Sequence, residues 1–257
     1  MEKLPKLIHQ RHGTSPISVY QQGQQRWLTF DDDITQSLID LSCPGLLPSP
    51  VNQAMLASLM TRNTPQNVLL AGTGGGSIAR FFHHHQPTIA GHAVEISAAV
   101  ANIAQTLFEF PAPSSNWQLI INDIQSHLLQ SAPLYDLIIV DISANHSTPQ
   151  WVYQPEFLTA CQQAMSDKGV LVINFLGSDE RQFATALIAL RRAFPNRTAC
   201  LTIPSHRNTL MYATSNDCCW GDIPADQISQ KTDRWGLGLT QLHQQLQQQN
   251  PTHSGLF

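Results

Sequence analysis

Short apolar runs alternate with helical repeats along most of the chain. Runs such as residues 137–140 and 170–173 contain only aliphatic side chains, which is typical of strands buried on both faces. The predicted strands are residues 68–71, 88–94, 117–121, 137–141, 170–175, 199–203 and 209–213, and the predicted helices are residues 49–60, 77–84, 97–108, 155–165, 179–194 and a short amphipathic 237–246. Strands that alternate with helices predict an α/β fold, Rossmann-like and doubly wound, with a mainly parallel seven-stranded sheet.

The first residues follow a different pattern. Residues 17–20, 26–30 and 34–41 read as short strands, and a proline-containing linker follows them. We therefore expect a small N-terminal β-strand module over residues 1–48. The Rossmann-like domain, expected to bind a nucleoside and carry catalysis, would span residues 49–257.

A glycine-rich loop, Gly72-Thr73-Gly74-Gly75-Gly76, joins the first strand of this domain to the next helix. Glycines permit positive φ and a close approach of ligand, and the helix start offers unpaired N–H groups, with Ser77 as the expected N-cap. The loop has neither the Gly-Lys-Ser/Thr of a P-loop nor the G-x-G-x-x-G dinucleotide spacing. A nucleoside without a pyrophosphate fits better, such as S-adenosylmethionine bound at Gly72, Gly74 and Gly76.

Acidic residues follow three further predicted strands. Glu95 stands 23 positions after Gly72, where a carboxylate can accept both hydroxyls of a ribose. Asp123 could accept a hydrogen bond from an adenine amino group while Ile124 packs on the ring. Asp141 would lie at the reactive end of the nucleoside, placed to hold or deprotonate an incoming amine. Each of the three acids could instead only cap a helix, turn or loop. Ligands of open α/β sheets lie outside the carboxyl ends of the strands, so we expect these groups to converge.

Composition excludes several function classes. The net charge of the 257 residues is −4, with 12% charged residues and no basic stripe, so we expect no nucleic-acid partner. No apolar run approaches the roughly 20 residues of a membrane span, and the N-terminus lacks the apolar region of a signal peptide. An odd number of cysteines without a C-x-x-C pair indicates reduced thiols in a cytoplasmic protein. These cysteines are Cys43, Cys161, Cys200, Cys218 and Cys219.

Two clusters could suggest a metal. Residues 31–33 are aspartates and residues 83–85 are histidines. Consecutive turn residues rarely converge on one ion, and consecutive helical residues point about 100° apart. Histidines are also favourable at a helix C-terminus. We therefore expect a solvated turn, a helix end and no metal site.

Seven segments of the chain form a recognisable set of motifs. They are Arg26-Trp-Leu-Thr-Phe-Asp with Ile34-Thr-Gln-Ser37, the glycine loop, Val94-Glu-Ile96, Asn122-Asp-Ile124, Tyr135-Asp-Leu-Ile-Ile-Val-Asp141, residues 152–157 and residues 169–174. This set resembles the motifs of the spermidine synthase family, which has the class I S-adenosylmethionine-dependent transferase fold. The resemblance extends from about residue 20 to residue 213 and implies that Gln36, Glu95, Asp123 and Ile124 contact the nucleoside, that Asp141 faces the attacking amine, and that the N-terminal module supports a homodimer.

This chain departs from the family pattern in three segments, and each departure removes an acidic side chain. The family loop reads G-G-G-D-G-G, whereas this chain has Gly75 where the aspartate stands. Asn52 and Ala54 replace a tyrosine and a glutamate, and Ala144 replaces the second acid of D-S-S-D-P. Because a polyamine is a chain of ammonium groups, its binding normally calls for several carboxylates. The departures weaken the case for a polyamine acceptor.

We therefore predict a transferase that uses S-adenosylmethionine or its decarboxylated form to alkylate a small-molecule nucleophile, for example an amine. Methyl transfer is slightly favoured over aminopropyl transfer, because the carboxylates that would bind the cationic groups of an aminopropyl donor and of its acceptor are missing. The first alternative is a true polyamine aminopropyltransferase whose acceptor acids come from Glu156 or residues 31–33. The second is a nucleoside-binding protein without catalysis.

Overall fold

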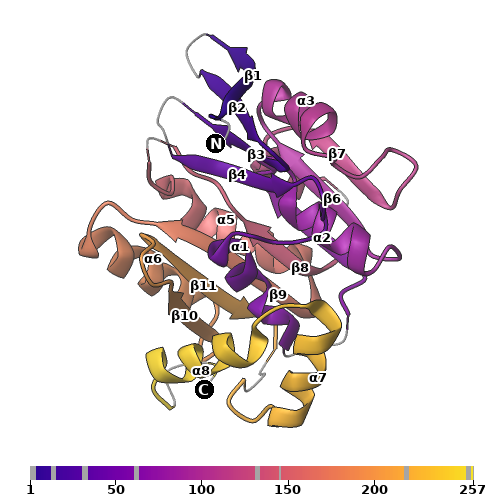
Figure 1. Cartoon of the computed structure of the whole chain (residues 1–257). Helices are drawn as coiled ribbons and strands as arrows, with labels where there is room; N and C mark the ends of the chain where they lie inside the picture. Colours follow the sequence, from indigo (N-terminus) through magenta and orange to yellow (C-terminus); the bar gives the residue numbers. More distant parts are fainter. Residues whose placement is uncertain are drawn as a thin grey trace.

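A computed structural model describes residues 4–12, 16–30, 34–60, 64–130, 134–144, 146–216, 220–252 and 256. Two separate sheets organise the chain (Figure 1). The N-terminal sheet contains β1 to β4, and the larger sheet contains β5 to β11.

The larger sheet has the strand order β10-β11-β9-β8-β5-β6-β7. Its strands are β5 (Asn67–Ala71), β6 (Ala90–Glu95), β7 (Trp117–Ile121), β8 (Tyr135–Val140), β9 (Met165–Leu176), β10 (Thr198–Thr202) and β11 (Asn208–Thr214). The five strands from β9 to β7 are parallel, and β11 runs antiparallel to both its neighbours. The predicted mainly parallel seven-stranded sheet is confirmed. The chain moves outward from β5 through β6 and β7 and then returns to β8, so the topological switch point lies between β5 and β8.

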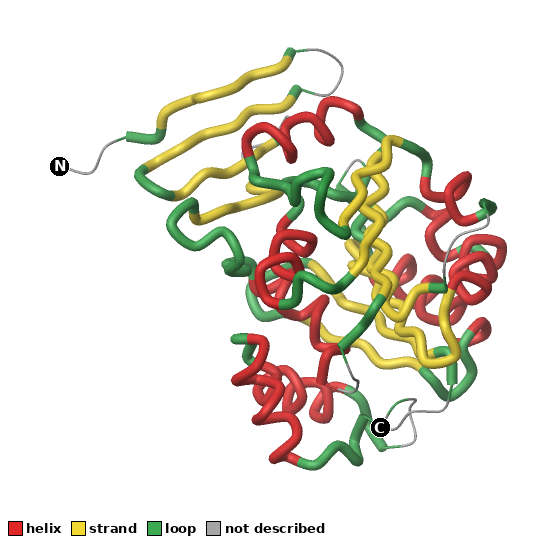
Figure 2. The backbone as a smooth tube through the Cα atoms, turned by 90° about the vertical axis from the view of Figure 1, so that its right-hand side faces the viewer, coloured by secondary structure: helices red, strands yellow, loops and turns green. Residues whose placement is uncertain are grey.

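Helices cover both faces of this sheet (Figure 2). The helical elements are α1 (Pro50–Met55), η1 (Leu56–Met60), α2 (Ser77–His85), α3 (Ala98–Leu107), α4 (Ile124–Leu128), η2 (Gln150–Tyr153), α5 (Pro155–Ala164), α6 (Glu180–Ala193), α7 (Ala225–Trp235) and α8 (Leu239–Gln249). One hydrophobic core joins the sheet to α1, α2, α7 and α8, and a second joins it to α4, α5 and α6. Leu137 and Ile139 of β8 belong to the first core, whereas Ile138 and Val140 belong to the second. This explains the uninterrupted apolar run.

The N-terminal sheet is an antiparallel meander of β1 (Lys6–Arg11), β2 (Ile17–Gln22), β3 (Gln25–Thr29) and β4 (Thr35–Asp40). Its apolar face packs on α3 in a third core that contains Val19, Leu28, Ile103 and Phe108. The sheet is thereby attached to the element that follows β6. The domain boundary at residue 48 stays a prediction, and residues 31–33 lie outside the described residues.

Several local predictions are wrong. Gly76, with φ of 74°, takes the N-cap position of α2 that we expected for Ser77, which is instead the first helical residue. The helix expected to reach residue 60 ends at Met55 and continues as the 3-10 turn η1. β1, α4 and α7 were not predicted, because β1 and α7 are mostly polar and α4 has only five residues.

No described helix has the length and apolar character needed to cross a membrane. Within the same residues, no group of three or more His, Cys, Asp or Glu side chains is arranged to hold a metal ion. Cys43, Cys161 and Cys200 are free thiols, whereas Cys218 and Cys219 lie outside the described part of the chain.

Candidate functional site

The glycine loop lies at the topological switch point, against the residue that follows β8. Gly72, Gly74 and Gly76 all have positive φ, at 87°, 50° and 74°. A Cβ atom on Gly72 would lie 2.2 Å from the carbonyl oxygen of Asp141. The backbone conformation and this close approach both require glycine, and they hold Asp141 beside the loop as the sequence predicted.

The N-terminal sheet contacts the glycine loop through Ser37 of β4. The Gly75 N–H donates to Ser37 Oγ at 2.7 Å. A Cβ atom at position 75 would lie 2.8 Å from Cδ1 of Phe108 and 2.9 Å from Cβ of Ser37. A side chain at the loop position that holds an aspartate in the family pattern would therefore require Phe108 or Ser37 to shift in this chain.

Gln36 is exposed and stands at a β-bulge next to this contact. Ser37 pairs with Leu28 and Thr35 pairs with Thr29, so Gln36 is the additional residue on β4. Bulges turn side chains toward new directions and are frequent beside active sites. A contact between Gln36 and the nucleoside stays a prediction.

Arg80 of α2 stabilises the glycine loop through hydrogen bonds to backbone carbonyl oxygens. It was not predicted as a site residue. Its side chain is only 1% exposed, and its guanidinium donates to the carbonyl oxygens of Gly75, Phe108 (2.6 Å) and Pro44 (3.2 Å). Burial lowers the pKa of Arg80 to about 10, partly opposed by the charge of Glu109. The arginine thus joins the loop, the linker and the end of α3.

Glu95, the last residue of β6, points its carboxylate toward the glycine loop. Oε2 accepts the Thr73 N–H at 3.0 Å, and Oε1 accepts the Ser97 N–H at 2.9 Å. An ionised carboxylate offers about four lone-pair positions, so each oxygen retains capacity for one ribose hydroxyl. The arrangement fits the ribose role that the sequence predicted, and that role stays a prediction.

Asp123 and Ile124 lie at the carboxyl end of β7, and both stabilise the local structure. Asp123 is the N-cap of α4, where its Oδ1 accepts the Gln125 N–H at 3.1 Å, and Ile124 packs in the second core. Two apolar side chains missed by sequence reasoning are exposed at the same edge, Ile96 at 75% and Ile121 at 59%. Exposed isoleucines beside Glu95 could cover a planar base. The adenine roles of Asp123 and Ile124 stay predictions.

A chain of amides orients Asp141. Asn174 Nδ2 donates to Asp141 Oδ1 at 2.7 Å, and Asn174 Oδ1 accepts from Asn208 Nδ2 at 2.9 Å. Solvent reaches Asp141, yet surrounding protein displaces enough water that desolvation raises its pKa; the nearby Glu95 raises it further, and the bond from Asn174 lowers it. A carboxylate with a raised pKa is a better general base near neutral pH.

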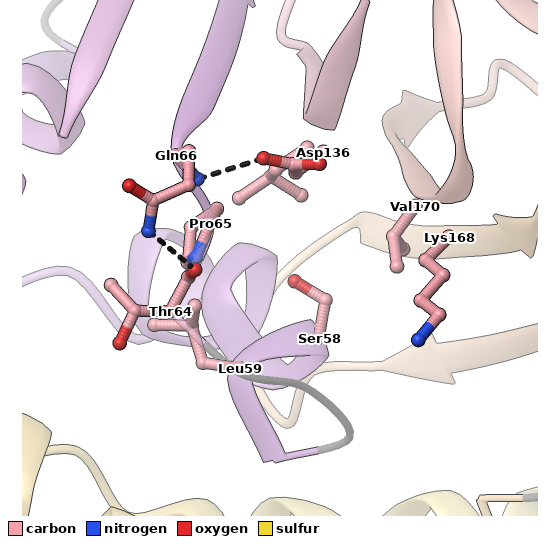
Figure 3. A pocket seen from close by; sticks show the side chains of 9 residues that line it. Ser58, Leu59, Thr64, Pro65, Gln66, Asp136, Lys168 and Val170 are labelled. Atoms are coloured by element: carbon pink, nitrogen blue, oxygen red, sulfur yellow. Dashed lines mark hydrogen bonds between the residues drawn. The ribbon is translucent and has the colours of Figure 1, made fainter.

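Asp136, in the same motif as Asp141, belongs to the opposite edge of the sheet. It lines a cavity of about 170 Å³ at the amino ends of β5 and β8 (Figure 3). Its oxygens accept from Gln66 N (2.8 Å), Asn67 N (3.1 Å) and Ser166 Oγ (2.8 Å). These bonds join β8 to the start of β5 and to β9, so Asp136 has a structural role.

Comparison with known proteins gives a family and two groups of relatives. The family described as "Spermine/spermidine synthase domain" matches residues 51–216. The polyamine aminopropyltransferase of Neisseria meningitidis is 26% identical over 257 residues, which cover 98% of this chain and 97% of that protein. The eEF1A lysine and N-terminal methyltransferase of Mus musculus is 32% identical over 162 residues, which cover 56% of this chain and only 23% of that protein.

Solved structures share the fold. A probable spermidine synthase from Corynebacterium glutamicum is 18% identical with a TM-score of 0.73, covering 99% of this chain and 98% of that one. Human Methyltransferase-like protein 13, solved in complex with SAH, is 21% identical with a TM-score of 0.63, covering 75% and 91%. The class I fold predicted from the sequence is confirmed.

Proposed function

Because the chain belongs to the spermine/spermidine synthase family, whose named relatives are transferases, we propose that it alkylates a small-molecule nucleophile. The alkyl donor is S-adenosylmethionine or its decarboxylated form, bound as a cosubstrate at the carboxyl ends of β5 to β8. Methyl transfer from S-adenosylmethionine is the reaction that we favour.

The proposed nucleoside site is the edge formed by the glycine loop, β6 and β7. Glu95 would accept the ribose hydroxyls with the lone pairs that Thr73 and Ser97 leave unused. Asp123 and the exposed Ile96 and Ile121 would contact the adenine. The fixed loop needs no rearrangement on binding, because Ser37 and Arg80 already hold it.

The packing around Gly75 supports our preference for S-adenosylmethionine over its decarboxylated form as the donor. This donor has an α-carboxylate that the decarboxylated form lacks, and an acid in the loop would repel it. Position 75 holds no acid, and a side chain there would require Phe108 or Ser37 to shift. Ala54, where the family pattern has a glutamate, is fully buried. Two of the expected cation-binding acids are thus absent from this chain's site.

Asp141 is the proposed base. The lone pair of the nucleophile would attack the carbon bonded to the sulfonium, the carbon–sulfur bond electrons would stay on sulfur as a neutral thioether, and Asp141 would take the nucleophile's proton. The sulfonium supplies the driving force, so the chain mainly has to align the reactants. Asn174 would fix the direction of the carboxylate.

Aminopropyl transfer to an amine is the second candidate, and the length of the alignment favours it. The polyamine aminopropyltransferases of Neisseria meningitidis and Chromobacterium violaceum match 98% and 93% of this chain, whereas the mouse methyltransferase matches 56%. Its acceptor acid would be Glu156, which is exposed in the first turn of α5, or residues 31–33, which lie outside the described residues.

Calorimetry with the two donors separates the candidates. We expect S-adenosylmethionine to bind at least as tightly as the decarboxylated form, and an acceptor screen to yield a methylated product. At least tenfold tighter binding of the decarboxylated form, with transfer to a diamine, would reverse the order. Binding of either donor without any product would favour the non-catalytic alternative.

We also propose that the N-terminal module forms a homodimer. β1 is an edge strand that pairs only with β2 within the described residues, and Leu7 on it is 43% exposed. Unprotected edges pair readily with another chain. Light scattering should give twice the monomer mass for the wild type and the monomer mass for Leu7→Lys; a wild-type monomer at all concentrations would refute the dimer.

A further inference from the structure

A second cavity lies away from the glycine loop, near the opposite end of α2. Its volume is about 340 Å³, within the range of small-molecule sites. It is bounded by β3 and β4, the linker that follows them, the last turn of α2 and the end of α7. No residue proposed for the nucleoside or for catalysis lines it.

Three aromatic rings form one wall of this cavity. The His85 ring stacks on Phe81 with centroids 4.2 Å apart, and Trp235 lies 5.9 Å from Phe81 and 6.5 Å from His85. Phe81 and Trp235 are almost fully buried, so their positions are fixed by core packing. Aromatic faces of this kind attract cations and pack on apolar groups.

The polar side chains that line the cavity still have lone pairs that can accept hydrogen bonds from a ligand. Asp40 Oδ1 accepts the N–H and Oγ–H of Ser42 at 2.9 and 2.5 Å, and the Cys43 N–H also interacts with the carboxylate. An ionised carboxylate has about four lone-pair positions, so Asp40 can accept a further hydrogen bond. His85 Nδ1–H donates to the Phe81 carbonyl at 3.0 Å, which leaves Nε2 as an acceptor in the neutral ring. Gln53 uses its Nε2 on a linker carbonyl at 2.8 Å, which leaves its amide oxygen.

The charge of the lining has one sign. Among the described lining residues, Asp40 is the one carboxylate and none is lysine or arginine. The Arg234 guanidinium lies outside this lining, 5.3 Å from the centroid of the Trp235 ring. The hydrogen bonds from Ser42 lower the pKa of Asp40, so this carboxylate is ionised at neutral pH. A matching ligand donates hydrogen bonds, carries positive charge and has an apolar body for the rings.

We propose that this cavity binds a small organic cation, an ammonium group on an apolar body, at Asp40 and the Phe81–His85–Trp235 wall. An ammonium has three donors and no acceptor, which complements the Asp40 carboxylate, His85 Nε2 and the Gln53 amide oxygen. The site is separate from the proposed acceptor position at Asp141.

Titration of the full-length protein with n-hexylammonium, followed by calorimetry or NMR, tests this site. We expect saturable binding of n-hexylammonium and at least fivefold weaker binding of hexan-1-ol, which lacks the charge. Asp40→Asn should weaken n-hexylammonium binding about fivefold, since Asp40 is partly exposed to solvent. The matched control Asp226→Asn, an exposed carboxylate on α7, should leave binding unchanged.

Two further variants test the proposed site independently of Asp40→Asn. Leu38→Phe fills the cavity while retaining Asp40, and it should abolish binding even if Asp40→Asn folds poorly. Asp141→Asn should have no effect, because it alters only the proposed acceptor position. Equal binding of the ammonium and the alcohol, loss of binding in Asp141→Asn, or unchanged binding in folded Asp40→Asn and Leu38→Phe proteins would overturn the proposal.

Discussion

The side-chain amide of Asn174 donates a 2.7 Å hydrogen bond to the Asp141 carboxylate across neighbouring strands. This bond holds the proposed base in one orientation and lowers its pKa against the opposing effect of desolvation. Asn174 is a positioning residue in this account, because it acts on the reaction only through Asp141.

Asn174→Ala should lower kcat/KM about tenfold, the order expected for a lost hydrogen bond to a charged group. The acid limb of the pH–rate profile should also move to higher pH, because the bond that lowers the Asp141 pKa is gone. Asn208→Ala, which removes only the next amide, should have a smaller effect on both. A lower rate with an unmoved pH profile would assign Asn174 a merely structural role.

Glu95→Gln should weaken binding of both donors about tenfold to a hundredfold. The charged acceptor for ribose is lost, and the side-chain NH₂ can oppose the N–H groups of Thr73 or Ser97. Calorimetry with S-adenosylmethionine measures the effect, and Glu180→Gln, an exposed acid on α6, is the control. Unchanged affinity in the Glu95 variant would exclude the carboxylate from the ribose site.

Arg80→Lys should lower the free energy of unfolding by about 2 kcal/mol or more, because buried carbonyl oxygens of Gly75, Phe108 and Pro44 lose donors. Donor affinity should fall with it, since the loop is no longer fixed. Arg192→Lys, on an exposed position of α6, should behave like the wild type in urea unfolding. If the Arg80→Lys protein were as stable as the wild type and bound the donor with full affinity, the hydrogen bonds of the Arg80 guanidinium would not be needed to hold the loop.

The folded protein should lose stability as the pH falls below about 6.5. Tyr135 Oη contacts His92 Nδ1 at 2.8 Å and His127 Nε2 at 3.2 Å, and burial lowers the pKa of both histidines, with His92 also lowering that of His127. Because the unfolded chain then binds more protons than the folded one, the free energy of unfolding decreases toward acid pH.

Urea unfolding at about pH 7.5 and about pH 5.5 measures this dependence on either side of the ordinary histidine pKa. His92→Asn should reduce the loss between the two values, whereas His206→Asn, at an exposed position, should not. Identical losses in the wild type and the His92 variant would rule out this network as the cause.

The parallel sheet and the position of the glycine loop could be predicted, because apolar runs indicate burial and glycines indicate unusual backbone conformations. Glu95 and Asp141 were proposed as site residues from their place after strands, and both lie beside the glycine loop, whereas their roles stay predictions. Periodicity does not reveal contacts between segments distant in sequence. Ser37 lies 38 residues from Gly75 and Asn174 lies 33 from Asp141, and neither was predicted.

Local propensity gives the wrong prediction where tertiary packing determines the structure. Serine is a good N-cap, yet Gly76 takes that position because the loop turns with positive φ immediately before α2. Arg80 reads as an ordinary polar residue on a helix, and only the tertiary structure shows it buried among carbonyl oxygens. The Asp40 cavity joins five chain segments and has no contiguous sequence signal.

We propose that an adenosine binds at the edge of the sheet between the glycine loop and β7, with its sulfur beside Asp141. A crystal structure of the full chain with S-adenosylhomocysteine would locate the nucleoside. We predict both ribose hydroxyls within hydrogen-bond distance of Glu95 and the thioether sulfur next to Asp141. A nucleoside bound in the cavity at Asp136 or in the cavity at Asp40, or Glu95 turned away from the ribose, would refute this proposal.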